Sequence, residues 1–163
     1  MLLYSSIKLI VFPLMTTYAR NKKATFNYEI LERFEAGVVL RGYEVKAIRS
    51  GKASLVGAYV VLREGEAFLK GASVTYYQEA NTPDSYNPER ERKLLLSKKE
   101  LLKIEKELNT AGLTIVPISW YSKSSKIKLE IALVRGKKKA DKREALKDRD
   151  NKRSLDRILK TER

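Results

Sequence analysis

A strictly alternating run near residue 130 constrains the fold more than any other feature of the sequence. Large aliphatic residues occupy every second position from 127 to 133, and Lys128, Glu130 and Ala132 fill the positions between them. This period of two is that of a β-strand, because successive side chains of a strand point to opposite faces of the sheet. An amphipathic helix would repeat its apolar residues every three or four positions. The run therefore predicts a mainly β fold.

Shorter segments elsewhere supply partners for that strand. Residues 59–62 and 67–69 are apolar and flank a short turn around Gly65, a pattern that predicts a β-hairpin. Further strands are predicted over residues 26–30, 38–40, 74–77 and 113–121. Pro117 indicates an edge or bulge position, and Gly37 a bulge or a close backbone approach. Several short strands with glycine turns predict a small closed or partly open barrel.

Two helices complete the predicted core. Ser97 and Glu100 have the spacing of a capping box, in which each side chain satisfies a backbone N–H at the helix start. Apolar residues then recur on one face, and Gly112 is expected directly after the helix end. A second, shorter helix is predicted over residues 44–49. Residues 81–88 are rich in Pro, Asp and Asn and predict a loop.

Composition limits what this fold can do. The chain has 34 Lys and Arg against 20 Asp and Glu, a formal charge of +14 and a pI near 9.9. This is the charge expected of a polyanion-binding protein, although charge alone leaves RNA, DNA, anionic lipid and no polyanion at all as alternatives. The chain has no Cys and no His, so it lacks thiolate chemistry, the usual general base and the commonest metal ligands. We expect no enzyme, no metal site and no cofactor.

A leader, a core and a tail differ in composition and define three predicted segments. The leader, residues 1–20, is apolar but has no basic n-region and no good cleavage site, so we expect a variable or over-extended start rather than a secretory signal. Its longest apolar stretch, residues 9–15, is too short to span a membrane. The predicted location is the cytoplasm. Residues 19–23 are basic and polar, and we expect an ordered entry segment or a loop there rather than part of the core.

The predicted core covers residues 21–135, and the tail covers residues 136–163. The tail has twelve basic and six acidic residues but few large apolar ones. Such a segment buries too little apolar surface to offset the entropy of ordering it. We therefore expect a tail that is disordered when free and helical when bound. Leu155, Ile158 and Leu159 form a small apolar stripe near its end, at helical spacing.

Five sequence strings, taken in order and at their spacing, resemble the SmpB family, the SsrA-binding proteins of bacterial trans-translation. The strings are NKKA (21–24), FEAG (34–37), GYEVKAIRSGKA (42–53), NPERERKLLL (87–96) and GKKKADKRE (136–144). The resemblance runs from about Asn21 to Arg163. It implies an OB-like antiparallel β-barrel with flanking helices and a basic C-terminal tail that becomes helical on the ribosome.

The resemblance also implies a function, that of an RNA-binding adaptor and not an enzyme. Members bind the tRNA-like domain of transfer-messenger RNA (SsrA RNA) and deliver it, charged with alanine, to stalled ribosomes. The tail enters the empty mRNA channel at the decoding region of the small subunit. Alanyl-tRNA synthetase and elongation factor Tu are implied as indirect partners through the charged RNA. No membrane partner is implied.

Individual residues take roles from the same resemblance. The implied RNA-binding residues are Asn21, Lys22, Lys23, Glu35, Arg90, Arg92, Lys93, Leu95 and Lys128. The implied ribosome-contacting residues of the tail are Lys137, Lys138, Asp141, Lys142, Arg143, Ile158 and Leu159. Judged from the residues alone, each has a plain alternative, such as a core position for Leu95 or an ordinary surface position for Lys128. Phe26 stands where the family commonly has His, and Ser97 where it has His or Asn.

Two other functions remain open at this point. A general OB-type ribosome-associated RNA-binding protein would show little preference for a tRNA-like fold over bulk RNA. An RNA-processing enzyme would need clustered carboxylates that hold a divalent metal. Asp141, Asp148 and Asp150 are interleaved with cations in the tail, which makes them poor ligands for a metal pair.

Overall fold

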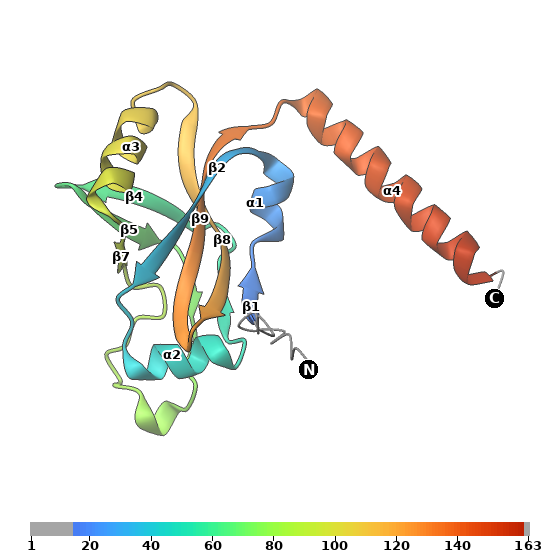
Figure 1. Cartoon of the computed structure of the whole chain (residues 1–163). Coiled ribbons are helices and arrows are strands. Elements are labelled where there is room, and N and C mark those ends of the chain that lie inside the picture. The colour runs from blue at the N-terminus through green and yellow to red at the C-terminus, as the bar shows by residue number, and fades with distance from the viewer. Residues whose placement is uncertain (1–14, 162–163) are drawn as a thin grey trace, which may run out of the picture.

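The computed structural model describes residues 15–161, and its centre is an antiparallel sheet that closes on itself. The sheet order is β1-β8-β4-β5-β7-β2-β9, and β9 pairs in addition with β8. Six strands therefore form a closed ring, with β1 attached outside it (Figure 1). The nine strands are β1 (Thr17–Arg20), β2 (Tyr28–Val38), β3 (Ala53–Ser54), β4 (Tyr59–Arg63), β5 (Glu66–Lys70), β6 (Ser73–Val74), β7 (Arg92–Leu95), β8 (Leu113–Lys123) and β9 (Lys126–Gly136). The predicted mainly β, barrel-like fold is confirmed.

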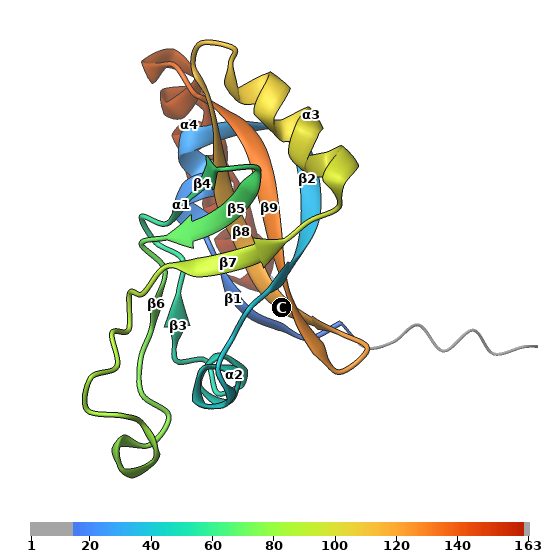
Figure 2. The same ribbon diagram turned by 90° about the vertical axis from the view of Figure 1, so that its left-hand side faces the viewer.

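Helices surround this barrel on three sides. They are α1 (Lys22–Asn27), α2 (Gly42–Arg49), η1 (Glu79–Asn81), α3 (Lys98–Leu108) and α4 (Lys139–Thr161). Helices α2 and α3 lie at opposite ends of the barrel (Figure 2). Each contributes a fully buried isoleucine to the core, Ile48 from α2 and Ile104 from α3. The predicted capping box of α3 is present, with both Ser97 and Glu100 bonded as expected.

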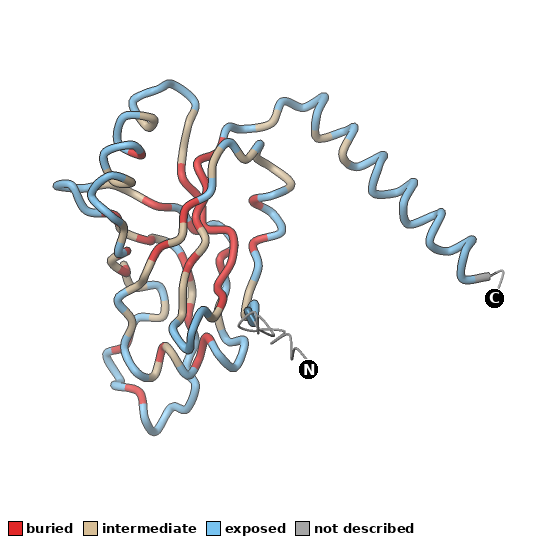
Figure 3. The backbone as a smooth tube through the Cα atoms, in the orientation of Figure 1, coloured by how far each residue is buried: buried red, intermediate tan, exposed pale blue. Residues whose placement is uncertain are grey.

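Strand β9, which contains the alternating run, is the structural centre of the barrel. It pairs with β8 from Leu113↔Arg135 to Lys123↔Lys126, and on its other side with β2. Leu129, Ile131 and Leu133 point into the main core, as predicted. Ala132 on the opposite face is also buried, because α1 covers that face. The strand therefore has a second, small apolar layer that strict alternation does not reveal, and Figure 3 shows its buried stretch.

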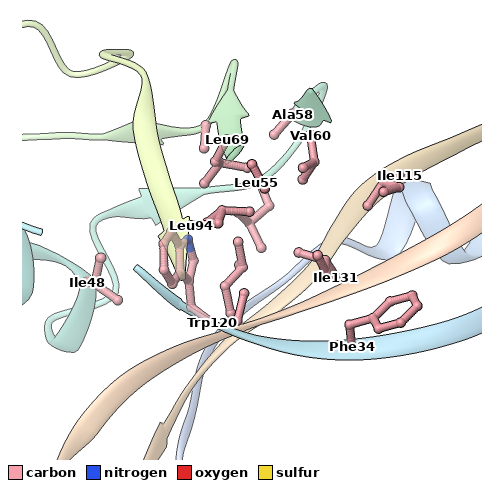
Figure 4. Packing of buried hydrophobic residues seen from close by; sticks show 14 of the residues in the cluster. Phe34, Ile48, Leu55, Ala58, Val60, Leu69, Leu94, Ile115, Trp120 and Ile131 are labelled. Carbon is pink, nitrogen blue, oxygen red and sulfur yellow. The ribbon is translucent and has the colours of Figure 1, made fainter. Parts of the chain in front are cut away.

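The main core is aliphatic and surrounds one tryptophan. Trp120 of β8 is fully buried together with Leu69 and Ile131, and Figure 4 shows these side chains converging from separate strands. The predicted irregularity at Pro117 is confirmed, because the register between β8 and β9 shifts between Pro117 and Ser119. The close approach expected at Gly37 is also confirmed. A Cβ atom there would lie 3.2 Å from Cβ of Leu95.

Several local predictions were wrong near the start of the chain. Of the two alternatives for residues 19–23, the ordered entry is correct and the loop is wrong, because β1 pairs with β8 and α1 begins at Lys22. Asn21 is nevertheless buried, contrary to the expectation for this segment. The sheet thus starts at Thr17, within the segment predicted as a leader. Phe26 lies in α1 rather than in a strand, and α1 ends at Asn27. Residues 1–14 of the predicted leader lie outside the described residues.

Other boundaries differ from prediction farther along the chain. The strand expected over residues 74–77 is limited to the two residues of β6. Helix α3 ends at Leu108, so Gly112, at a φ of 81°, serves the turn before β8 rather than the helix end. The tail forms the 23-residue helix α4, and a helix is what we predicted for its bound form. Twelve of its 23 residues are Leu, Lys or Arg, which are good helix formers.

A buried ion cluster fixes α2 to the barrel. Glu44 of α2 and Arg92 of β7 are both 0% exposed and lie 2.9 Å apart. Arg90 donates a second charged bond to the same carboxylate. Burial alone raises the pKa of Glu44, but hydrogen bonds from Arg90 and from the Arg41 backbone, together with the charge of Arg92, outweigh it and lower that pKa. Glu44 therefore stays ionised inside the protein.

We predict that Glu44→Gln destabilises the fold strongly. Removing one partner of a buried ion pair leaves the other charge uncompensated and costs about 3–5 kcal/mol. Urea unfolding at pH 7 measures this change. The matched control is Glu66→Gln, which breaks the exposed Lys93–Glu66 pair and should cost less than about 1 kcal/mol. Equal losses for the two variants would contradict a central role for the cluster.

Low pH should destabilise the protein through the same carboxylate, that of Glu44. Because the pKa of Glu44 is lowered in the folded state, its contribution to stability is present above the ordinary value of about 4.5 and is lost as the pH falls below it. The wild-type free energy of unfolding should therefore decrease between about pH 5 and pH 3. The Glu44→Gln variant should show a shallower decrease over the same range.

Candidate functional site

A shallow groove runs along the edge where β7, β2 and β9 meet. Gly37 of β2 pairs with Leu95 on one side and with Lys128 on the other, so the backbone register places these two predicted residues on either side of one glycine. The groove has a volume of about 380 Å³, and α2 contributes Val45 and Arg49 to its wall. A β-branched or larger residue at Gly37 would close the approach to Leu95.

Leu95 is a surface residue, so the core alternative for it is wrong, and its contact with RNA stays a prediction. Its side chain is 53% exposed, although its neighbour Leu94 is buried in the core. Leu95 lies across Gly37 from Lys128, so an apolar side chain and a cation flank the same glycine. Lys128 forms no ion pair among the described residues, so its charge is available to an anionic partner.

Glu35 lies two residues before Gly37 on the same face of β2, where it is held by two neighbours. Its carboxylate accepts a hydrogen bond from the Tyr121 hydroxyl at 2.5 Å and two from the Lys123 ammonium at 2.9 Å. The bond from Tyr121, followed by that from Lys123, lowers the pKa of Glu35. Burial raises the pKa of Tyr121, and the neighbouring Glu35 raises it further. The pair thus consists of an ionised carboxylate and a protonated phenol.

A second hollow adjoins Glu35 on the side of β1. It has a volume of about 440 Å³ and is bordered by Glu35, Tyr121, Arg33 and Glu130, among others. Arg33 and Glu130 form an ion pair at 2.6 Å across β2 and β9, and Ser119 donates to the other oxygen of Glu130. These charges therefore neutralise one another, unlike that of Lys128.

Asn21 has a structural role that the sequence analysis missed. It is only 3% exposed. Its side-chain oxygen caps α1 by accepting from the Ala24 N–H, and its amide donates to the carbonyls of Leu55 and Pro117. The expectation that Asn21 contacts RNA directly is not supported, because its hydrogen-bonding groups are already used. Lys22 and Lys23, by contrast, are exposed on the first turn of α1.

Arg90, Arg92 and Lys93 do not share one surface. The expectation of a phosphate contact by Arg92 is wrong, because its guanidinium is fully buried and its five N–H donors bond to protein atoms. Arg90 is partly exposed but is bound to Glu44. Lys93 points outward and is paired with Glu66. The basic segment 90–93 is thus mainly a structural element.

The predicted tail residues lie along α4 and in the connection before it. Lys137 is anchored to the barrel, because its backbone N–H donates to the Asn27 carbonyl at 3.0 Å. Asp141 accepts from the Lys138 N–H at 3.2 Å and so caps the helix. Ile158 and Leu159 are exposed and belong to neither buried core cluster of the described residues. Lys142 and Arg143 follow on the first turns of α4.

Some participants were invisible to sequence reasoning. Tyr121 and Lys123 are 86 and 88 residues away from Glu35, and only the pairing of β8 and β9 with β2 brings them to its carboxylate. Arg49 joins the groove through α2. The alternation on β8 was a usable signal, because it places Tyr121 and Lys123 on one face of the strand.

The described residues offer little for metal chemistry. Within residues 15–161 no group of three or more acidic side chains is arranged to hold a metal ion. No helix in this range is long and apolar enough to cross a membrane.

Together, fold and surface define a small antiparallel barrel protein with a binding groove and a basic C-terminal helix. The family model for SmpB protein matches residues 18–161. The chain is 45% identical over 143 residues to the SsrA-binding protein of Albidiferax ferrireducens, covering 88% of this chain and 91% of that one. It is 46% identical over 142 residues to the SsrA-binding protein of a Sulfurihydrogenibium species, covering 87% and 93%. The chain belongs to the SmpB family.

A solved structure agrees with this assignment. The structure described as "tmRNA-SmpB: a journey to the center of the bacterial ribosome" contains a chain that superposes with a TM-score of 0.63 at 36% identity. The match covers 78% of this chain and 93% of that one. The resemblance inferred from five sequence strings is thereby confirmed.

We predict that Tyr121→Phe raises the pKa of Glu35. The phenol hydrogen bond is the largest influence that holds this pKa low, and phenylalanine keeps the packing while removing the donor. Carboxyl-carbon NMR titration measures the midpoint, which lies below about 4.5 in the wild type and should move toward that value. Tyr59→Phe, at an exposed tyrosine that makes no contact with Glu35 in the described residues, is the control and should leave the midpoint unchanged.

Proposed function

We propose that this protein is an RNA-binding adaptor of trans-translation that acts without catalysing a reaction. It binds the tRNA-like domain of transfer-messenger RNA and delivers the charged RNA to stalled ribosomes in the cytoplasm. Alanyl-tRNA synthetase and elongation factor Tu are linked to it only through that RNA. The observation that carries the proposal is the groove at Gly37, where an unpaired cation and an exposed leucine flank one glycine, in a chain of the SmpB family.

The groove has the chemistry that RNA recognition needs. Lys128 supplies a charge for a phosphate, and phosphate contacts fix the position of a nucleic acid without reading its sequence. Leu95 offers an apolar surface for the face of a base or sugar. Glu35 can accept a hydrogen bond from a base amino group, because its lowered pKa keeps it ionised at neutral pH. Tyr121 and Lys123 hold that carboxylate in place.

The tail supports the ribosomal part of the proposal. Helix α4 is basic and projects away from the barrel (Figure 1). Its apolar residues Leu155, Ile158 and Leu159 are all more than half exposed, so they bury their surface only against another molecule. A cationic helix with one apolar stripe suits a channel lined by RNA, such as the vacant mRNA channel of a stalled ribosome.

We predict that Lys128→Ala weakens binding to the tRNA-like domain and reduces its salt dependence. Removing one phosphate contact should lower the slope of log K against log salt by about 1, because fewer counterions are released on binding. Filter binding or fluorescence anisotropy at several salt concentrations measures both quantities. Lys106→Ala, at an exposed position on α3, is the matched control, and an equal effect there would argue against a specific groove.

We also predict that RNA binding and ribosome rescue separate in a truncated chain. Because β9 ends at Gly136, a chain ending there keeps every strand pairing of the barrel. It should bind the tRNA-like domain with nearly full affinity but fail to support peptide tagging on stalled ribosomes in a reconstituted system. Parallel loss of both activities would count against two separate surfaces.

The general RNA-binding alternative has its own test. Competition between the tRNA-like domain and bulk RNA at fixed salt compares the two affinities directly. A preference of less than a few fold would favour a non-specific ribosome-associated protein. A strong preference for the tRNA-like domain is the expected result.

A further inference from the structure

A third hollow is lined by α2 and by the segment that runs from Tyr77 into η1. Helix α2 lies at the end of the barrel opposite α3 (Figures 1 and 2). The volume of the hollow is about 240 Å³, below the range for a drug-sized ligand and suited to a single ring system. Its lining is polar and aromatic and consists of Gly42, Tyr43, Lys46, Tyr77, Gln78 and Asn81.

The aromatic walls of this hollow are held in place from beneath. Tyr86 is buried, and its hydroxyl donates to the Val74 carbonyl at 2.8 Å. The rings of Tyr43 and Tyr76 pack edge-on against it, at centroid distances of 4.9 and 5.7 Å. The Tyr43 hydroxyl also accepts from Arg41 at 2.7 Å. One wall of the hollow is therefore rigid before any ligand arrives.

Tyr77 also lines the hollow, and a lysine ammonium lies over its ring. Lys52 donates to the Tyr77 carbonyl at 3.2 Å, and its ammonium lies 5.9 Å from the centre of the Tyr77 ring. The Tyr77 side chain is 39% exposed, so a large aromatic surface faces solvent beside a positive charge. Gln78 and Asn81 are hydrogen-bonded to each other at the rim, at 2.6 Å. Their amides offer donors and acceptors of the kind that read base edges.

The exposed cations around α2 lack an ion-pair partner within residues 15–161, unlike several on the barrel wall. Lys93 and Arg63 of the wall, for example, pair with Glu66 and Glu91. The side chains around α2 form no ion pair among the described residues; they are Arg41, Lys46, Arg49 and Lys52. The one carboxylate of α2, Glu44, is buried and neutralised by two arginines. The exposed charged side chains of this helix are thus all cationic.

We propose that this hollow is a stacking site for one unpaired nucleotide of the bound RNA, with the base against Tyr77 and the phosphate near Lys46 and Lys52. Aromatic surfaces interleaved with unpaired cations are the arrangement that binds single-stranded nucleic acid. Arg49 of the same helix lines the groove, so a strand that leaves the groove can pass along α2. The inference rests on the proposed function, because it assumes that the partner in the groove is RNA.

The test compares Tyr77→Ala with Tyr77→Phe in the full chain. The probes are the tRNA-like domain, a single-stranded oligoadenosine carrying one 2-aminopurine, and a blunt RNA hairpin. Losing one stacked base should weaken oligonucleotide binding by about 5- to 100-fold in Tyr77→Ala and remove the fluorescence quenching of the 2-aminopurine. Tyr77→Phe keeps the ring and should bind within about twofold of the wild type. Hairpin binding should not change.

Controls distinguish the loss of this site from a loss of folding, and a failure of this inference from a failure of the proposed function. Tyr59→Ala removes another exposed tyrosine, on β4, and should have no effect, while thermal unfolding checks that each variant is folded. Lys52→Ala should lower the salt slope by about 1. If the wild type prefers the tRNA-like domain but Tyr77→Ala binds every probe as the wild type does, the stacking site is refuted and the proposed function stands. If the wild type shows no such preference, the proposed function is refuted, and the stacking site that rests on it is refuted with it.

Discussion

The buried carboxylate of Glu44 is the interaction on which the functional end of this protein depends. Two guanidinium groups converge on it, and the one from Arg92 uses all five of its N–H donors inside the protein. A buried charge is tolerated only when its partner groups are complete. Completing this set requires α2, β7 and the loop that contains Tyr86 and Pro88 to take fixed positions. The groove and the hollow that α2 lines both inherit their geometry from this cluster.

The same cluster shows why the sequence misled the assignment of single residues. A run of cations at 90–93 reads as a phosphate-binding patch, yet strand alternation places Arg92 on the same face as the buried Leu94 and puts Lys93 and Leu95 outside. Three acceptors of the Arg92 guanidinium are close in sequence, at Tyr86, Pro88 and Arg90. Its charge partner is distant, because Glu44 lies 48 residues away. Local sequence gives no sign of such a partner.

Features that depend on local sequence were predictable, and those that depend on distant partners were not. The hairpin of β4 and β5, the capping box at Ser97 and the central strand β9 follow from short patterns. Helix α1 was missed because its cap, Asn21, is fixed by the carbonyls of Leu55 and Pro117. In the groove, alternation suggested that Lys128 faces outward. Only the register of three strands shows that Leu95 lies next to it across Gly37.

The attachment of the tail is consistent with a helix that changes partners while the barrel stays intact. Two hydrogen bonds from Lys137 to carbonyls of α1 fix the connection. Beyond it, Arg149 lies 5.7 Å from the ring centre of Phe26, a contact worth about 0.5–1 kcal/mol at an exposed site. That energy is small against the burial of three large aliphatic side chains, at roughly 1.5–3 kcal/mol each. A surface that accepts Leu155, Ile158 and Leu159 can therefore draw α4 away from α1 without breaking any pairing of the sheet.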